Sequence, residues 1–174
     1  MITLRQERTA DVEAREALLD QAFGDTRYRK TSQRLRESRL PAEGLSLIAV
    51  DGGRVIGTAR LWSVVCGTGQ PALLLGPVAV EASCRNRGIG AALVRHALHV
   101  ARRLRHSAVI LVGDPPYYSR FGFTGENTAS LKLPGPFERH RLLALELVPG
   151  ALDNARGTVG ATGRLAQKPH RRVA

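Results

Sequence analysis

The chain has 174 residues, which is enough for one domain with a hydrophobic core and short for two. No apolar run approaches the ~18 residues that cross a membrane, and the first residues lack the apolar core of a secretion signal. The two cysteines, Cys66 and Cys84, form no Cys-x-x-Cys pair, so we expect a cytoplasmic protein without a disulfide framework or structural zinc. The formal charge of +11, carried almost wholly by arginine, favours an anionic partner or reflects a generally arginine-rich surface.

The spacing of apolar residues divides the chain into short strands and two long helices. Residues 12–23 have helical spacing after Thr9, which suits an N-cap, and residues 89–104 form a second helix with one apolar face. Residues 31–39 predict a short helix with a thin apolar face, and another short helix starts at Asp114. The strands that we expect are residues 2–8, 45–50, 55–62, 73–80, 107–112, 129–133 and 142–148.

The order of these elements predicts an α/β fold with a mixed, mostly antiparallel sheet. Residues 51–54, Asp-Gly-Gly-Arg, supply the positive φ angles of a tight hairpin turn. The last two strands, 129–133 and 142–148, would form an antiparallel pair. Residues 151–174 change to Gly, Ala, Arg and Thr with little periodicity, so we expect a basic tail, poorly ordered or extended, after one domain at 1–150.

A turn of small and charged residues joins the strand at 73–80 to the long helix. Its sequence is Arg85-Asn86-Arg87-Gly88-Ile89-Gly90-Ala91. Glycines let the backbone approach a ligand, the N–H groups of the first helical turn point at it, and two arginines add positive charge. We therefore interpret the turn as a diphosphate site. A Walker A string is absent from the sequence, and a dinucleotide fingerprint fails because Leu93 replaces its third glycine and residues 107–112 hold no acid.

This turn resembles the acetyl-CoA-binding motif of the GNAT superfamily of N-acetyltransferases, Arg/Gln-x-x-Gly-x-Gly/Ala at the start of a helix that follows a central strand. Residues 85–90 match that motif, and residues 117–123, Tyr-Tyr-Ser-Arg-Phe-Gly-Phe, look like the family's Tyr-x-x-Phe-Gly-Phe signature. Both motifs occur in the family's order and spacing, and the resemblance covers most of residues 1–150. It implies the GNAT fold of the single-domain bacterial type, whose helix-flanked sheet is split between its two central parallel strands.

The resemblance also implies which residues hold the cosubstrate acetyl-CoA. They would be Val78, Ala79, Val80, Arg85, Asn86, Arg87, Gly88, Ile89, Gly90 and Ala91. The three strand residues would bind the pantetheine through their backbone, and the N–H of Val78 would face the thioester oxygen. Gly76 and Pro77 would bend the strand outward, since proline removes a hydrogen-bond donor from the sheet.

Tyr118 is the catalytic candidate, because it matches the family tyrosine near the sulfur of CoA. A phenol of pKa ~10 stays protonated at neutral pH and can donate to a departing thiolate of pKa ~8.5 or higher. The other interpretation is that Tyr117 and Tyr118 only pack the short helix. Cys84 is disfavoured as an acyl-carrying nucleophile, because direct transfer is the family's usual route.

The general base has no match on the central strand, where several family members place an acid or a histidine. Residues 71–80 contain neither. Glu81, just beyond the strand, is interpreted as a solvated loop carboxylate, which leaves Glu43, Asp114 or a chain of waters. A substrate amine of low pKa would need no strong base. His96 and His99 lie on the long helix without a Cys or carboxylate companion, so we expect no metal.

The function implied by the resemblance is direct transfer of an acetyl group from acetyl-CoA to a primary amine of a small molecule or protein. One alternative is an acyl-CoA-binding sensor without turnover, which the missing strand carboxylate favours and Tyr118 opposes. Another is acetylation of an RNA- or ribosome-associated amine, although the tail lacks the interleaved aromatic residues on which bases stack. We expect no membrane partner. The sequence leaves open whether the protein forms a homodimer.

Overall fold

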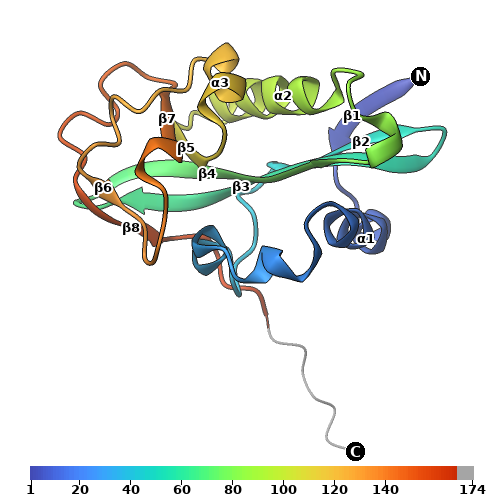
Figure 1. Cartoon of the computed structure of the whole chain (residues 1–174), viewed down its shortest axis with the longest axis horizontal. Coiled ribbons are helices and arrows are strands. Elements are labelled where there is room, and N and C mark those ends of the chain that lie inside the picture. The colour runs from blue at the N-terminus through green and yellow to red at the C-terminus, as the bar shows by residue number, and fades with distance from the viewer. Residues whose placement is uncertain (168–174) are drawn as a thin grey trace, which may run out of the picture.

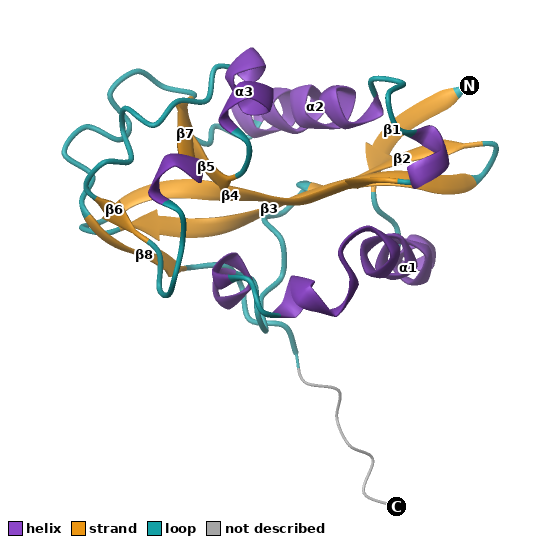
Figure 2. Ribbon diagram, in the orientation of Figure 1, coloured by secondary structure: helices purple, strands orange, loops and turns teal. Residues whose placement is uncertain are grey.

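A mixed sheet of eight strands lies between two layers of helices in the computed structural model, which describes residues 1–167 (Figure 1). The strands are β1 (Ile2–Gln6), β2 (Ser46–Asp51), β3 (Arg54–Cys66), β4 (Gln70–Val80), β5 (Ala108–Val112), β6 (Leu131–Lys132), β7 (Leu142–Glu146) and β8 (Gly157–Ala161). The α-helices are α1 (Val12–Phe23), α2 (Ile89–Arg103) and α3 (Pro115–Tyr118). Helices α2 and α3 cover one face of the sheet, and α1 covers the other (Figure 2).

The sheet has the strand order β1-β2-β3-β4-β5-β7, and β4 and β5 are its central parallel pair. Strand β3 is 13 residues long because it serves two neighbours along the same edge. Its first half pairs with β2, and Val64–Cys66 pairs with β8, which in turn pairs with β6. The predicted α/β fold with a mixed, mostly antiparallel sheet is confirmed.

Helix α2 is the amphipathic helix that the sequence predicts. Its buried residues, among them Ile89, Leu93 and Ala97, belong to the main core cluster on this face of the sheet. The helix lies so close to β3 that a Cβ on Gly57 would come within 2.9 Å of the Leu93 side chain. Within residues 1–167, no helix combines the length and the apolar character that a membrane crossing needs.

The two central strands separate soon after they begin to pair. Only Leu73 and Leu74 of β4 are in register with β5, opposite Val109 and Ile110. Beyond that point β4 continues to Val80 beside β3 alone. The predicted split between the central parallel strands is confirmed.

The predicted last antiparallel pair is wrong. Leu131–Lys132 runs parallel to β8, and Leu142–Glu146 pairs antiparallel with β5. The other edge of β7 is occupied by an antiparallel bridge between Thr124 and Ala144. The edge of β7 was therefore not available to residues 129–133. Leu131–Lys132 pairs instead with β8, which comes later in the chain.

The expected tail is wrong for residues 151–167, and its remainder, 168–174, lies outside the described residues. Leu152, Ala155 and Val159 are buried in the second core cluster, on the face opposite α2. The chain passes so close to the turn after β3 that a Cβ on Gly67 would lie 1.6 Å from the carbonyl oxygen of Arg156. Few apolar residues suffice here, because backbone pairing also holds β8: residues 159–161 pair with β3, and residues 157 and 158 pair with β6.

We predict that Val159→Ala lowers the free energy of unfolding by about 1–3 kcal/mol, because it removes methyl groups from a buried position of β8. The neighbouring Thr158→Ala, at an exposed position, should change it by less than about 0.5 kcal/mol. Urea denaturation of both variants measures the difference. Equal midpoints for the two variants would show that β8 does not contribute to the cooperative fold.

Candidate active site

The bend in β4 lies just beyond the point at which its pairing with β5 ends. The register between β3 and β4 shifts here, which leaves Arg60 opposite both Gly76 and Pro77. Such a bulge bends a strand, and proline offers no N–H for pairing. The indole N–H of Trp62 donates to the carbonyl oxygen of Gly76 at 2.6 Å and holds the bend from the side of β3. The bend predicted at these two residues is confirmed.

Beyond the bend, the edge of β4 that faces β5 has no paired strand among residues 1–167. Val78, Ala79 and Val80 lie on this stretch and pair with β3 on their other edge. Val78 and Val80 pack toward the core on the α2 face, whereas Ala79 packs against α1. Their outward N–H and C=O groups are free to bind an extended ligand in the manner of an added strand.

The predicted diphosphate turn forms the start of α2. Asn86 and Gly88 have positive φ angles, 61° and 75°, and they turn the chain into the helix. Gly88 occupies the N-cap position and offers no side chain, so the N–H groups of the first helical turn have no side-chain cap. Arg85 and Arg87 are exposed beside these N–H groups. The geometry therefore provides donors and positive charge suited to a bound anion.

Tyr118 lies at the carboxyl end of β5, beside the opening between the two strands. A Cβ on Gly113 would lie 2.4 Å from the Tyr118 ring, so the glycine leaves room for the ring directly after the strand. Phe123 and Phe121 surround the ring, with centroids 6.0 and 6.1 Å away. The hydroxyl has no hydrogen-bond partner within residues 1–167. Burial, followed by the neighbouring Tyr117, raises the pKa of Tyr118 to about 12.

The neighbouring Tyr117 points elsewhere. Its hydroxyl would come within 3.3 Å of a Cβ on Gly90, in the first turn of α2, and Val80 lies against the same glycine. Arg120 stacks on the ring of Tyr117, with its guanidinium carbon 4.4 Å from the centroid. The two adjacent tyrosines thus lie at different places. Tyr117 lies at the start of α2, and Tyr118 lies beside the opening between β4 and β5.

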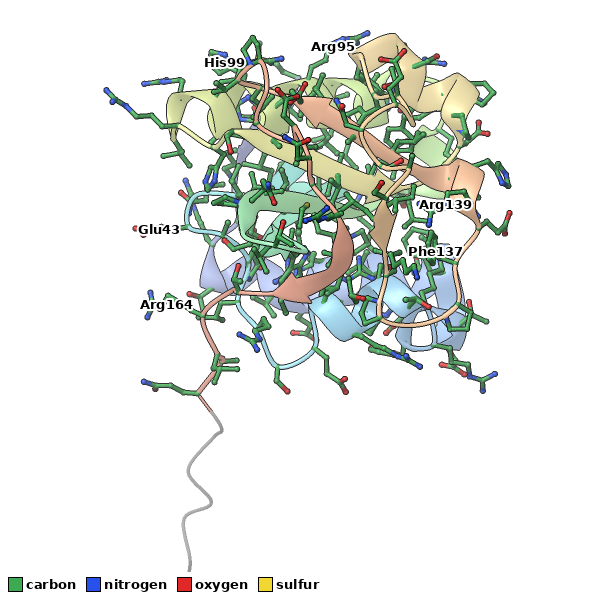
Figure 3. The ribbon with its side chains drawn as sticks, turned by 90° about the vertical axis from the view of Figure 1, so that its left-hand side faces the viewer. Glu43, Arg95, His99, Phe137, Arg139 and Arg164 are labelled. Atoms are coloured by element: carbon green, nitrogen blue, oxygen red, sulfur yellow. The ribbon has the colours of Figure 1, made fainter. Side chains whose placement is uncertain are left out.

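None of the three carboxylates considered as a base lies on the bend. Glu43 is exposed and its side chain projects away from the ribbon (Figure 3). Glu81 forms an ion pair with Arg54 at 3.1 Å. Asp114 is exposed at the start of α3, and its backbone carbonyl accepts a hydrogen bond from the N–H of Tyr118.

The thiol of Cys84 lies in the core rather than at the opening. Cys84 is 4 % exposed and belongs to the core on the α2 face, where it packs rather than faces a ligand. Within residues 1–167 no group of three or more His, Cys, Asp or Glu side chains is arranged to hold a metal ion.

Sequence reasoning missed the basic residues on the opposite face of the bend. A Cβ on Gly76 would lie 3.4 Å from Nη1 of Arg36, and Arg60 faces the bulge from β3. Arg36 follows a 3₁₀ helix, Thr31–Leu35, where the sequence predicted an ordinary short helix. In an arginine-rich sequence no local pattern marks these two side chains, because only the folded chain brings them to β4.

Comparison with known proteins places this architecture in a family. A model of the acetyltransferase (GNAT) domain matches residues 3–125. The chain belongs to the GNAT acetyltransferases. It is 32% identical over 158 residues to the uncharacterized N-acetyltransferase YhbS of Escherichia coli strain K12, covering 86% of this chain and 94% of YhbS. The GNAT membership predicted from the two motifs is confirmed.

Two solved GNAT structures are similar over nearly the whole chain. YhbS of Escherichia coli, in complex with CoA, has a TM-score of 0.76 and 29% identity, and the match covers 92% of this chain and 89% of YhbS. A GNAT acetyltransferase of Brucella melitensis, in complex with acetyl-CoA, has a TM-score of 0.67 and 27% identity, covering 93% of this chain and 96% of that chain.

We predict that Tyr118 makes the protein less stable as the pH rises from about 10 to about 12, since its folded pKa of about 12 exceeds the unfolded value of ~10. In this range the folded state holds a proton that the unfolded state has released, so alkali favours unfolding. Urea midpoints at pH 9 and pH 11 measure the effect. Tyr118→Phe should lose less stability over this interval than the wild type, and an equal loss would contradict the raised pKa.

Proposed function

We propose that this GNAT protein transfers the acetyl group of acetyl-CoA directly to a primary amine. The observation that carries the proposal is the convergence of three features at one place: the unpaired edge of β4, the uncapped start of α2 and the free hydroxyl of Tyr118. Each suits a different part of an acyl-CoA molecule. The CoA and acetyl-CoA complexes of its two relatives support the choice of this ligand.

The start of α2 would bind the diphosphate of the cosubstrate. The residues that we assign to this part are Arg85, Asn86, Arg87, Gly88, Ile89, Gly90 and Ala91. Backbone N–H groups of the first helical turn donate to phosphate oxygens, and the two arginines supply charge and further donors. A Cβ on Gly90 would lie 3.3 Å from the hydroxyl of Tyr117 and 3.6 Å from Val80, so this position suits a small residue.

The edge of β4 would bind the pantetheine arm. Val78, Ala79 and Val80 offer backbone groups at strand spacing, and the arm enters the opening as an additional strand would. The N–H of Val78, next to the bend, would donate to the thioester oxygen and stabilise the negative charge that develops there. This alignment brings the thioester to the end of β5, where Tyr118 lies.

Tyr118 would act where the C–S bond breaks. The neutral amine attacks the thioester carbonyl carbon, a C–N bond forms, the C–S bond breaks, and the nitrogen gives one proton to water. Tyr118 donates its phenolic proton to the sulfur and regains one from water. Burial raises the pKa of Tyr118 to about 12. A CoA thiol held beside it would be buried as well, and its pKa would rise for the same reason. The pKa values of the proton donor and of the accepting thiolate would therefore stay similar.

The acceptor would bind as the free amine without a carboxylate base on β4. The pKa of Lys30 is lowered by burial and by the charges of Arg36 and Arg141. Arg36, whose Nη1 lies beside Gly76, would likewise disfavour the ammonium form of an acceptor amine at the bend.

We predict that Tyr118→Phe lowers kcat about 100-fold or more, the size expected of a lost general acid, while acetyl-CoA stabilises both proteins equally. Free-thiol release with a panel of primary amines and thermal shift with acetyl-CoA measure the two properties. Tyr117→Phe is the matched comparison and should change kcat only a few-fold, because its hydroxyl lies at the helix start. An undiminished rate in Tyr118→Phe would leave Tyr118 a packing residue, and stabilisation without thiol release from any amine would favour the sensor function.

We predict that Arg85→Ala and Arg87→Ala each weaken CoA binding about 10-fold and reduce its dependence on salt, because each removes a charged contact to phosphate. Isothermal titration at two salt concentrations measures both effects. Arg103→Ala, at the other end of α2, is the control and should bind CoA as the wild type does. Wild-type affinity in both turn variants would contradict the assignment of the diphosphate site.

A further inference from the structure

Four arginines gather on the sheet face opposite α2, and burial together with the charges of the others lowers the pKa of two of them. They are Arg15, Arg27, Arg36 and Arg60. Two of them are matched by carboxylates. Arg15 binds Glu7 through two hydrogen bonds of 2.9 Å, and Arg27 lies 2.5 Å from Glu16 and 2.9 Å from Asp20.

Arg36 has no such partner. It is 9% exposed, yet no carboxylate lies within 4 Å of its guanidinium among residues 1–167. Within residues 1–167 its Nε is buried without a hydrogen-bond partner, and the one hydrogen bond of its side chain is long, 3.5 Å from Nη2 to the hydroxyl of Ser32. A guanidinium carries five N–H donors, so most of its bonding capacity stays unused inside the protein. A buried charge in this condition is costly unless something else pairs with it.

The unpaired guanidinium lies at the bend of β4. Its Nη1 would be 3.4 Å from a Cβ on Gly76, whose lack of a side chain leaves the approach open. The carbonyl oxygen of Gly76 accepts a hydrogen bond from the indole N–H of Trp62, and within residues 1–167 the guanidinium of Arg36 donates to Ser32 and not to this oxygen. Arg36 therefore presents its charge at the position where β4 and β5 part.

Arg60 adds a second cation at the same bend. It faces the bulge from β3, stacks 4.6 Å above the ring of Trp62, and donates from Nε to Ser46 at 3.3 Å. No carboxylate lies within 4 Å of it in the described part of the chain. Burial lowers the pKa of both arginines to about 10, and the charge of Arg60 contributes to the shift at Arg36. The nearby charges of Glu7 and Glu16 offset this at Arg60 only in part.

An acceptor must reach the thioester from the side that acetyl-CoA leaves free. The proposed cosubstrate site begins at α2, on one face of the sheet, while Arg36 follows the 3₁₀ helix on the other face (Figure 1). Together with burial, the charges of Arg36 and Arg141 lower the pKa of Lys30, and the charge of Arg141 partly offsets the rise that burial causes in the pKa of Tyr118. Positive charge therefore extends from Arg36 toward the catalytic candidate. The acceptor side of the opening is thus positively charged.

We propose that Arg36, assisted by Arg60, binds an anionic group on the acceptor, so that the preferred substrates are amines that also carry a carboxylate or a phosphate. The inference rests on the proposed acetyl transfer and narrows its substrate class. An oxyanion would take up the unused N–H donors of Arg36 and relieve the repulsion between the two arginines. Polyamines and other multiply cationic acceptors would be repelled.

The test compares amines that differ only in the anion. β-Alanine is paired with propylamine and O-phosphoethanolamine with ethanolamine, and spermidine is the cationic acceptor. In thiol release the wild type should show kcat/KM at least about 10-fold higher for the anionic member of one pair, the gain expected of a charged hydrogen bond. The pair with the larger ratio identifies carboxylate or phosphate as the group recognised.

Arg36→Met should abolish this preference, measured as the ratio of kcat/KM within each pair, while thermal stabilisation by acetyl-CoA stays that of the wild type. Arg36→Lys should restore part of it, and Arg29→Met, at an exposed position nearby in the chain, should keep it whole. The urea midpoint of ligand-free Arg36→Met should equal or exceed that of the wild type, because an unpaired buried charge is removed. A lower midpoint together with an unchanged preference would mean that Arg36 only supports the fold and would overturn the proposal.

A separate readout distinguishes this proposal from failure of the transferase function. Thermal shift with CoA present, titrated with β-alanine or O-phosphoethanolamine, needs no turnover. Stabilisation of the wild type but not of Arg36→Met would support the anion site even if no amine released thiol. Equal responses of the two proteins, or a wild-type preference for spermidine, would refute it.

Discussion

The structure depends on one interruption in hydrogen bonding, the loss of pairing between β4 and β5 after Leu74. A strand edge inside a sheet is normally satisfied by its neighbour, and an unpaired edge is a strong site for another chain or ligand. The bulge at Gly76 and Pro77, held by Trp62, turns β4 away before β5 ends. Everything that we assign to function lies around this opening: α2 starts beyond the far end of β4, and Tyr118 follows the end of β5.

The two faces of the sheet have different physical characters at this opening. On the α2 face, an apolar core and an aromatic cluster surround Tyr118, and burial keeps its phenol protonated. On the other face, a network of arginines and carboxylates reaches the bend, and its charges do not balance. A thioester held between them would meet a proton donor on one side and positive charge on the other. In the function that we propose, this asymmetry would place the cosubstrate on one side of the opening and the acceptor on the other.

Much of the fold and of the candidate site could be predicted from local patterns. The apolar face of α2 and the Asp-Gly-Gly turn between β2 and β3 depend on residues a few positions apart, and the structure shows these three elements within a few residues of their expected ends. The pairing of β6 and β7 was predicted wrongly, because strand partners are chosen by free edges, and Thr124 had taken the available edge of β7. The tail was misjudged because β8 is held by backbone hydrogen bonds and a few small side chains, which leave little periodicity.

The sequence by itself determined the strand–turn–helix that contains Arg85 to Ala91 and the aromatic segment with Tyr118. Those motifs depend on glycine, proline and charge at fixed short spacings. Only the tertiary structure decided which arginines lie at the bend and which of them find carboxylates. Arg36 and Gly76 are distant in the chain, and the pairing of a charge depends on where the fold places its neighbours. A composition rich in arginine predicts positive charge but not which guanidinium lacks a partner. In the folded chain Glu7 pairs with Arg15, and Glu16 and Asp20 pair with Arg27, which leaves the guanidinium beside β4 without a carboxylate among residues 1–167.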